Sequence, residues 1–240
     1  WSRIEGAAPA VTPNIHPDRR DVGYPASVVA QAGYHMADAS APLADGSWTA
    51  ILWSAWSAVH AARLLLDGEM AAYALCRPPG HHAFADMAGG FCYLNNAAIA
   101  AQMLRRAHER VAILDVDLHH GNGTQAIFYR RNDVLTVSIH ADPERFYPFF
   151  WGYAKETGAD TGEGFNLNLP LPRGTGDDGW LTALDTGIRR IRDFAPGALV
   201  VALGLDAFAG DPFGGLRLTT RGFGEIGRRL AAELRLPTLL

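Results

Sequence analysis

An alternation of short apolar segments with amphipathic ones constrains the fold of this 240-residue chain most strongly. The runs VAILDVD (111–117) and VLTVSIH (134–140) are continuously apolar and rich in β-branched residues, which is typical of strands buried on both faces of a parallel sheet. Helical patterns separate such runs, so we expect an α/β fold: a single domain, 1–240, with a central, mainly parallel sheet flanked by helices. The expected strands are 71–75, 111–117, 134–140, 198–206 and 236–240, and the expected helices are 50–66, 95–110, 177–194 and 219–234.

The composition excludes several classes of function. The net charge of −4 gives no general attraction for polyanions, so we expect no nucleic-acid partner. Two cysteines cannot form a disulfide framework, which fits a cytoplasmic protein. The most apolar long segment, 50–66, contains His60 and Arg63 and is too short and too polar to span a bilayer, so we expect no membrane partner. Residues 1–50 lack sustained periodicity and are expected to form loops with a helix or two.

Polar clusters follow four of the expected strands. They are RPPGHH (77–82), DLHHGNG (117–123), HADPERFYP (140–148) and DAFAGDP (206–212). In open α/β sheets, ligands bind beyond the carboxyl ends of the strands. We therefore expect these four loops to meet at one edge of the sheet and to form the active site there.

The segment ILDVDLHHGNGTQ (113–125) places acids and histidines directly after an apolar run. If it is extended, Asp115, Asp117 and His119 share one face and His120 points to the other. With Asp206 from a neighbouring strand end, one of these acids and His119 would complete a set of two carboxylates and one imidazole, which gives a catalytic zinc ion three ligands and leaves one position open. An acid here could instead cap a turn, but capping requires neither a second acid nor a histidine.

The adjacent pair His81 and His82 follows a Pro-Pro-Gly loop that can hold imidazoles rigidly. Neighbouring histidines can be plain surface residues, but the same edge carries the acids, which favours acid–base catalysis. A catalytic histidine needs an orienting partner, and Asp115 and Asn122 are the candidates.

Five segments resemble the successive signature motifs of the histone deacetylase family, in the family's order. They are RPPGHHA (77–83), GGFCYLNNAAIAA (89–101), ILDVDLHHGNGTQAIFY (113–129), SIHADPERFYP (138–148) and LGLDAFAGDPFGG (203–215). Residues 146–172 most resemble bacterial acetylpolyamine amidohydrolases and class II-like deacetylases. The resemblance implies an arginase/deacetylase-like fold for the whole chain, with a single deacetylase-like catalytic domain.

The resemblance also implies a role for each matching residue. The zinc ligands are matched by Asp117, His119 and Asp206, and the tandem catalytic histidines by His81 and His82. Asp115 matches the acid paired with the first histidine, and Asn122 stands where some relatives have an Asp paired with the second. The two aromatic walls of the substrate channel are matched by Phe91 and Tyr147, the backbone position beside it is matched by Gly90, and a further substrate-binding candidate is Phe213. Asp115, Asp117 and His119, with Ser138, match a family site for a monovalent cation, K⁺. The family tyrosine that completes the oxyanion site follows the last strand and has no match in 1–240, so we expect the natural chain to continue beyond both ends.

These residues predict a zinc-dependent amidohydrolase that deacetylates an acetylpolyamine or an acetyl-lysine peptide. The metal could be zinc or iron in the cell, and the enzyme could be a homo-oligomer. Two alternatives stay open. One is a zinc-containing, weakly catalytic binder of acylated amines. The other is a ureohydrolase, which would require a two-metal cluster with more acids at these strand ends, and the histidine pair argues against it.

Overall fold

The computed structural model describes residue 15 and residues 23–240. Residues 1–50 were expected to form loops with a helix or two, and the described part of that segment contains α1 (Val28–Tyr34). For residues 1–14 and 16–22, the expectation lies outside the described residues.

The core of the protein is a six-stranded sheet with the order β1-β6-β5-β2-β3-β4, and every pair of neighbouring strands is parallel. The strands are β1 (Ala71–Ala72), β2 (Val111–Asp115), β3 (Val134–Ala141), β4 (Asn166–Leu171), β5 (Ala198–Ala202) and β6 (Thr238–Leu239). Since consecutive parallel strands need crossover connections, helices must cover both faces. The predicted α/β class, with a parallel sheet between helices, is confirmed.

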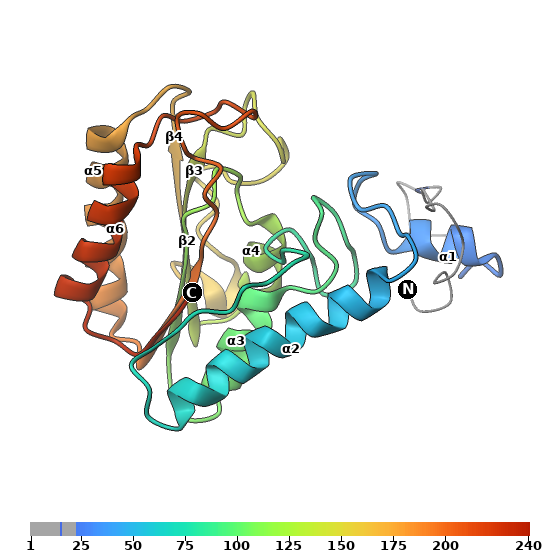
Figure 1. The fold of residues 1–240 in the computed structure, drawn as a ribbon, viewed down its shortest axis with the longest axis horizontal. Coiled ribbons are helices and arrows are strands. Elements are labelled where there is room, and N and C mark those ends of the chain that lie inside the picture. Colours follow the sequence, from blue (N-terminus) through green and yellow to red (C-terminus); the bar gives the residue numbers. More distant parts are fainter. Residues whose placement is uncertain (1–14, 16–22) are drawn as a thin grey trace.

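The helices form a layer on each side of the sheet (Figure 1). They are α2 (Ser47–Leu66), α3 (Asn96–Leu104) and α4 (Asn122–Phe128) on one face, and α5 (Asp177–Phe194) and α6 (Thr220–Glu233) on the other, with a 3₁₀ turn, η2, at Asp160–Gly162. Among the described residues, none of these helices has the length and apolarity needed to cross a membrane.

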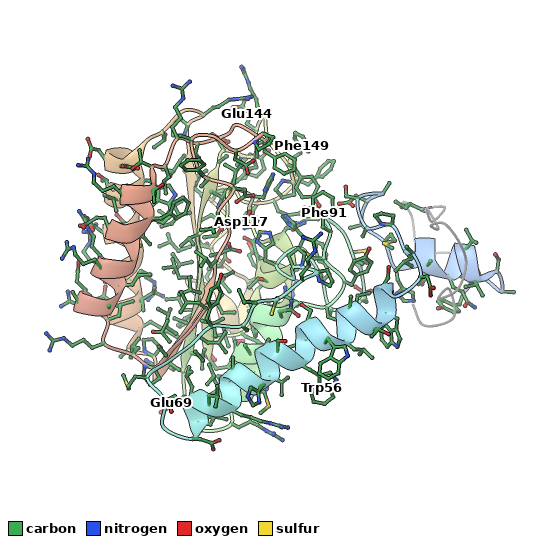
Figure 2. The ribbon with its side chains drawn as sticks, in the orientation of Figure 1. Trp56, Glu69, Phe91, Asp117, Glu144 and Phe149 are labelled. Atoms are coloured by element: carbon green, nitrogen blue, oxygen red, sulfur yellow. The ribbon has the colours of Figure 1, made fainter. Side chains whose placement is uncertain are left out.

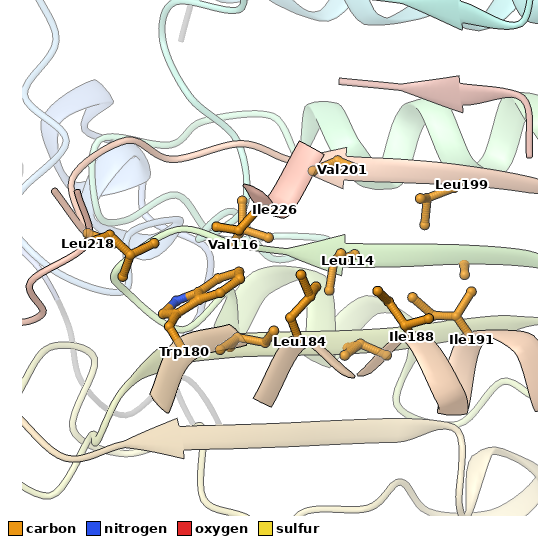
Figure 3. Close-up of a cluster of buried hydrophobic side chains, with 14 of the residues drawn as sticks. Leu114, Val116, Trp180, Leu184, Ile188, Ile191, Leu199, Val201, Leu218 and Ile226 are labelled. Carbon is orange, nitrogen blue, oxygen red and sulfur yellow. The ribbon is translucent and has the colours of Figure 1, made fainter. Parts of the chain in front are cut away.

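Helix α5 shows how the sequence pattern produces the packing. Trp180, Leu184 and Ile188 are spaced four residues apart, which places them on one face of the helix, and all three are buried. They pack in one cluster with Leu114 and Val116 from and just after β2 (Figure 3). Every residue of β2 is buried, as expected for a strand covered on both faces.

Several predicted elements are shorter than the sequence suggested. β1 ends at Ala72 and β5 at Ala202, so all of 203–206 belongs to the loop that carries Asp206. The helix expected over 95–110 ends at Leu104, where the chain turns to enter β2. The helix begins where it was predicted to begin. Asn95 is its N-cap, and the Asn95 side chain accepts a hydrogen bond from the backbone N–H of Ala98 (2.9 Å).

Strand β4 and helix α4 are absent from the predicted elements. β4 has the sequence NLNLPL, in which polar residues and a proline conceal the strand pattern. β4 lies at the edge of the sheet, and an edge strand tolerates a proline such as Pro170, which has no backbone N–H to donate to a neighbouring strand. The amides of Asn166 and Asn168 are buried but hydrogen-bonded to Gln125, which satisfies their polarity.

Candidate active site

Three predicted metal ligands meet at the carboxyl ends of two adjacent strands. Asp117 and His119 follow β2, and Asp206 follows β5, which pairs with β2. One ligand atom from each residue lies within 4.8 Å of the others. His119 Nδ1 is 2.9 Å from Oδ2 of Asp206 and 3.3 Å from Oδ1 of Asp117. The loops after two strands far apart in sequence thus form one cluster.

The backbone fixes the two carboxylates in this cluster. Oδ1 of Asp206 accepts the N–H of Leu118 at 2.9 Å, and Oδ1 of Asp117 accepts the N–H of His119 at 2.8 Å. A Cβ atom on Gly204 would lie 2.0 Å from Oδ2 of Asp117, so only glycine fits there. The sequence argument assumed an extended chain through His119, whereas β2 ends at Asp115. The turn that follows, rather than strand alternation, brings His119 beside Asp117.

The cluster is electrostatically suited to a cation. Burial raises the pKa of Asp206. Burial also acts to raise the pKa of Asp117, but the neighbouring imidazoles of His81 and His119 outweigh it and hold that pKa well below its usual range. Burial opposes the protonation of His119, yet its bonds to the two carboxylates raise its pKa to about 9. Two carboxylates and one imidazole, partly open to solvent, fit a divalent metal such as zinc and leave it a free position.

The two adjacent histidines have different partners. His81 Nδ1 lies 2.9 Å from Oδ2 of Asp115, and His82 Nδ1 lies 2.7 Å from Oδ1 of Asn122. The two rings are 4.0 Å apart, and His81 Nε2 is 3.8 Å from Oδ1 of Asp117. The orienting partners predicted for the two histidines therefore lie in hydrogen-bonding contact with them.

The partners give the two histidines opposite proton affinities. Burial acts to lower the pKa of His81, but the negative charges of Asp115 and Asp117 outweigh it and raise this pKa to about 9. Burial and the adjacent charge of His81 hold the pKa of His82 well below its usual range. The carbonyl oxygen of Asn122 can only accept, so neutral His82 donates from Nδ1 and keeps a lone pair on Nε2. The pair combines a cationic imidazole with a neutral one.

Gly90 and Tyr147 lie against the second histidine. A Cβ on Gly90 would be 2.3 Å from Cδ2 of His82 and 2.9 Å from Oη of Tyr147, so this position requires glycine. The Tyr147 ring meets the His82 ring edge to face at 4.9 Å. Gly90 and Tyr147 therefore both lie directly against His82.

The other two predicted substrate residues lie farther out. Phe213 meets the ring of His119 edge to face at 5.3 Å and is half exposed. Phe91 follows Gly90, is half exposed, and also lines a hollow of 580 Å³ together with Pro42 and Pro79. Figure 2 labels Phe91, Phe149 and Asp117 in the part of the molecule between the sheet and α1. The structure thus places Phe213 against a metal ligand and Phe91 at the outer edge of the site.

Sequence reasoning missed two residues of this site. The Phe146 ring stacks on His119 at 5.1 Å, and the only signal for it was its place in the FYP motif. Asp38 accepts a hydrogen bond from the Tyr147 hydroxyl at 2.5 Å. Asp38 lies in a segment without periodicity or motif, so no local pattern could have indicated it.

The second histidine of the HHG motif belongs to a separate network. His120 is buried, and its ring lies 4.7 Å from that of His140. His140 Nε2 donates to the carbonyl of Gly152 (2.9 Å), so its Nδ1 accepts from the Ser138 hydroxyl (2.8 Å). Ser138 stands opposite Asp115 in the register of β2 and β3. This network joins the loop after β3 to the sheet.

Comparisons with known proteins agree with these observations. Residues 15–237 match the model of the histone deacetylase domain. An acetylpolyamine amidohydrolase of Burkholderia pseudomallei (strain 1710b) is 55% identical over 213 residues, which are 89% of this chain and 62% of that protein. An acetylpolyamine amidohydrolase of Mycoplana ramosa is 44% identical over 237 residues, 97% of this chain and 70% of that protein. The crystal structure of an acetylpolyamine aminohydrolase from Burkholderia pseudomallei superposes with a TM-score of 0.93 at 51% identity, covering 99% of this chain and 70% of that one.

Proposed function

Because the chain belongs to the histone deacetylase domain family, we propose that it hydrolyses the amide bond of acetylated amines, with acetylpolyamines as the preferred substrates. The observation that carries this proposal is the histidine pair beside the Asp117, His119 and Asp206 cluster. The acetylpolyamine preference is supported by the names of the similar proteins, of which this chain spans 62% and 70% in the two curated cases. An acetyl-lysine peptide is the other substrate of the same chemistry.

Asp117, His119 and Asp206 would hold the zinc ion. A zinc ion bound there would act as a Lewis acid on the amide carbonyl and lower the pKa of water. Iron(II) is the other metal that these ligands suit.

A monovalent cation such as K⁺ is a separate proposal for Asp115, Asp117, His119 and Ser138. It is supported by the Ser138 hydroxyl, which donates to His140 and so keeps its oxygen lone pairs available.

His82 is the proposed general base. Its neutral Nε2 can accept a proton from the attacking water and then give it to the departing amine nitrogen, since a pKa below neutrality favours release. His81 stays protonated through Asp115 and supplies a positive charge next to it. Asn122 orients His82 without adding the negative charge that would raise its pKa. The hydrophobic surface of Tyr147 excludes water from this proton transfer.

One observation favours the weakly catalytic binder as the second candidate. The resemblance assigns one oxyanion donor to a tyrosine hydroxyl, and removing an oxyanion donor typically costs about a hundredfold to a thousandfold in rate. The Tyr147 hydroxyl already donates to Asp38, and the Tyr153 hydroxyl donates to the carbonyl of Phe149 (2.8 Å). Neither tyrosine offers its hydroxyl proton to the histidine pair.

A turnover assay on the zinc-loaded chain tests both candidates. N-acetylputrescine, N-acetylspermidine and an acetyl-lysine peptide are incubated with the protein, and the released amine is quantified by chromatography. Hydrolysis that disappears in His82→Ala, with zinc retained, supports the amidohydrolase. Tight binding of acetylputrescine without turnover supports the binder instead. Chain mass in solution and the site of accumulation in cells test the further proposals of a homo-oligomer and of a cytoplasmic protein.

A further inference from the structure

The carboxylate of Asp38 joins three separate segments of the chain. Its Oδ2 accepts the Tyr147 hydroxyl at 2.5 Å and the backbone N–H of Gly90 at 3.1 Å. Its Oδ1 accepts the N–H of Ser40 at 2.8 Å and the same Gly90 N–H at 3.3 Å. Tyr147 is 109 positions and Gly90 is 52 positions away in sequence. One side chain therefore connects the loop after α1, the loop before α3 and the loop after β3.

The segments that Asp38 joins form the inner edge of the proposed channel. Gly90 packs so closely that a Cβ would be 2.9 Å from Oη of Tyr147, and Tyr147 in turn meets the His82 ring at 4.9 Å. Any shift of the Tyr147 ring or of the Gly90 backbone changes the space beside the catalytic histidine. Asp38 is bonded to both of them.

The backbone beside this contact is strained. Gly90 has φ = 51° and Phe91 has φ = 66°. A bulky residue in this left-handed region is unfavourable and persists only when the surrounding structure holds it in place. The Gly90 N–H that bonds to Asp38 belongs to the peptide between Gly89 and Gly90, which directly precedes this left-handed pair. Asp38 therefore holds Tyr147 through the hydroxyl of that tyrosine and Gly90 through its backbone N–H.

Two simpler roles for Asp38 account for less. A local turn explains only the bond to Ser40, two residues on, and leaves the contacts of Oδ2 unexplained. A charge reserved for the substrate's ammonium group would present its oxygens to solvent. Here each oxygen already accepts two protein donors, counting the shared Gly90 N–H on both.

We propose that Asp38 is a positioning residue that latches Tyr147 to the Gly90 backbone and thereby fixes the width of the channel beside His82. This role rests on the proposed function, since it takes the space beside His82 to be the path of the substrate. The latch acts through two walls of the channel and does not require Asp38 to touch the substrate.

Amide hydrogen exchange tests the latch without any turnover. In Asp38→Ala, exchange in peptides covering 89–92 should accelerate about tenfold, the factor expected for the loss of one hydrogen bond to a charged group. Asp38→Asn keeps one acceptor oxygen and should give an intermediate rate. Asp45→Asn is the matched control, because within the described residues this exposed carboxylate accepts only the N–H of its neighbour Gly46. Unchanged exchange at 89–92 in Asp38→Ala would overturn the latch.

Ligand binding tests the consequence for specificity. Hexanohydroxamic acid and its 3,3-dimethyl analogue are titrated into the zinc-loaded protein, and the linear probe should bind about tenfold tighter, since a pocket discriminates modestly between alkyl groups. In Asp38→Ala the ratio should fall towards one, and in Asp45→Asn it should not change. Tyr147→Phe should lower the ratio, and adding it to Asp38→Ala should have no further effect.

A third probe distinguishes the latch from a substrate-binding charge. If Asp38→Ala weakens only 6-aminohexanohydroxamic acid and leaves the linear-to-branched ratio unchanged, Asp38 binds the substrate's cation and the latch is wrong. Zinc content and Tm are measured for every variant, so that unfolding is detected directly. Absence of hydrolysis in the unmodified chain would contradict the proposed function while leaving the exchange and binding results interpretable.

Discussion

The two ends of the same parallel sheet carry charged clusters of opposite character. At the amino end, just before β3, Asp133 accepts from Nε of Arg105 (2.7 Å) and from Nη2 of Arg131 (2.7 Å). At the carboxyl end, Asp117 and Asp206 both contact the imidazole of His119, and Asp117 also lies 3.8 Å from Nε2 of His81. The first cluster has two guanidinium partners for one acid, whereas the second, counting Asp115 beside His81, has three acids for two imidazoles.

The difference in charge balance separates a structural cluster from a functional one. A carboxylate held by two guanidiniums needs nothing further, and the pKa of Asp133 accordingly falls to about 2, through its bond to Arg131 first and Arg105 after it. Clustered carboxylates with too few cations are costly to keep apart from water. Such a cluster persists where a bound cation compensates it, and this argument singles out the carboxyl end as the candidate metal site without any reference to relatives.

The largest effect is expected from removing a ligand at the carboxyl end. Asp206→Ala and His119→Ala should each abolish stoichiometric zinc binding, because two remaining protein ligands hold a catalytic zinc poorly. Metal analysis of the dialysed variants measures this directly. Full zinc occupancy in a folded Asp206→Ala protein would show that the ligand set is wrong.

The next effect separates chemistry from metal binding at the same end. His82→Ala should retain zinc and lose turnover on the order of a thousandfold, as expected for a general base outside the metal's ligands. Steady-state kinetics with N-acetylputrescine, together with metal analysis, give both quantities. Near-normal kcat in this variant would transfer the base role to His81.

The sheet and the site could be predicted to different degrees for physical reasons. Apolar runs predicted β2 and β3, and the helix expected over 177–194 is α5, because the burial of these elements is reflected in their local sequence. β4 was missed because its buried positions are Asn166 and Asn168, whose amides are satisfied by partners far away in the chain. Local hydrophobicity cannot reveal a strand that buries polar groups.

For the site, the motif residues were predictable and their non-local partners were not. His81 and Asp115 belong to recognisable motifs, and their contact follows from the meeting of strand ends. Asp38 carries no motif and acquires its role only through Gly90 and Tyr147, which are distant in sequence. The contacts that position a site can thus come from segments whose own sequence is uninformative.

The apolar interior between the two ends offers a control for both. Leu184→Ala removes a fully buried side chain from the α5 face of the sheet (Figure 3) and should cost about 3 kcal/mol of unfolding free energy. For a chain of this size, that lowers Tm by about 6–12 °C. The zinc affinity of the folded protein should not change, because the side chain touches no ligand. A parallel loss of zinc affinity would mean that the core and the site are coupled.

The smallest effect concerns the amino end, and it depends on pH. The folded-state pKa of Asp133, about 2, lies below its ordinary value of 3.8, so the unfolded chain takes up the proton first as the pH falls. The stabilisation is therefore complete above about pH 4 and is lost between about pH 4 and pH 2. Since the group is partly exposed, we expect Asp133→Asn to cost about 1 kcal/mol at pH 7, after allowing for solvent screening. Urea denaturation of both proteins should give free energies of unfolding that differ at pH 7 and converge towards pH 2.5.

The matched control is Asp160→Asn, whose partner Arg130 is exposed, and its free energy of unfolding should not differ from that of the unmodified protein at either pH. An Asp133→Asn deficit that persists unchanged at pH 2.5 would show that the side chain acts through packing and not through its charge.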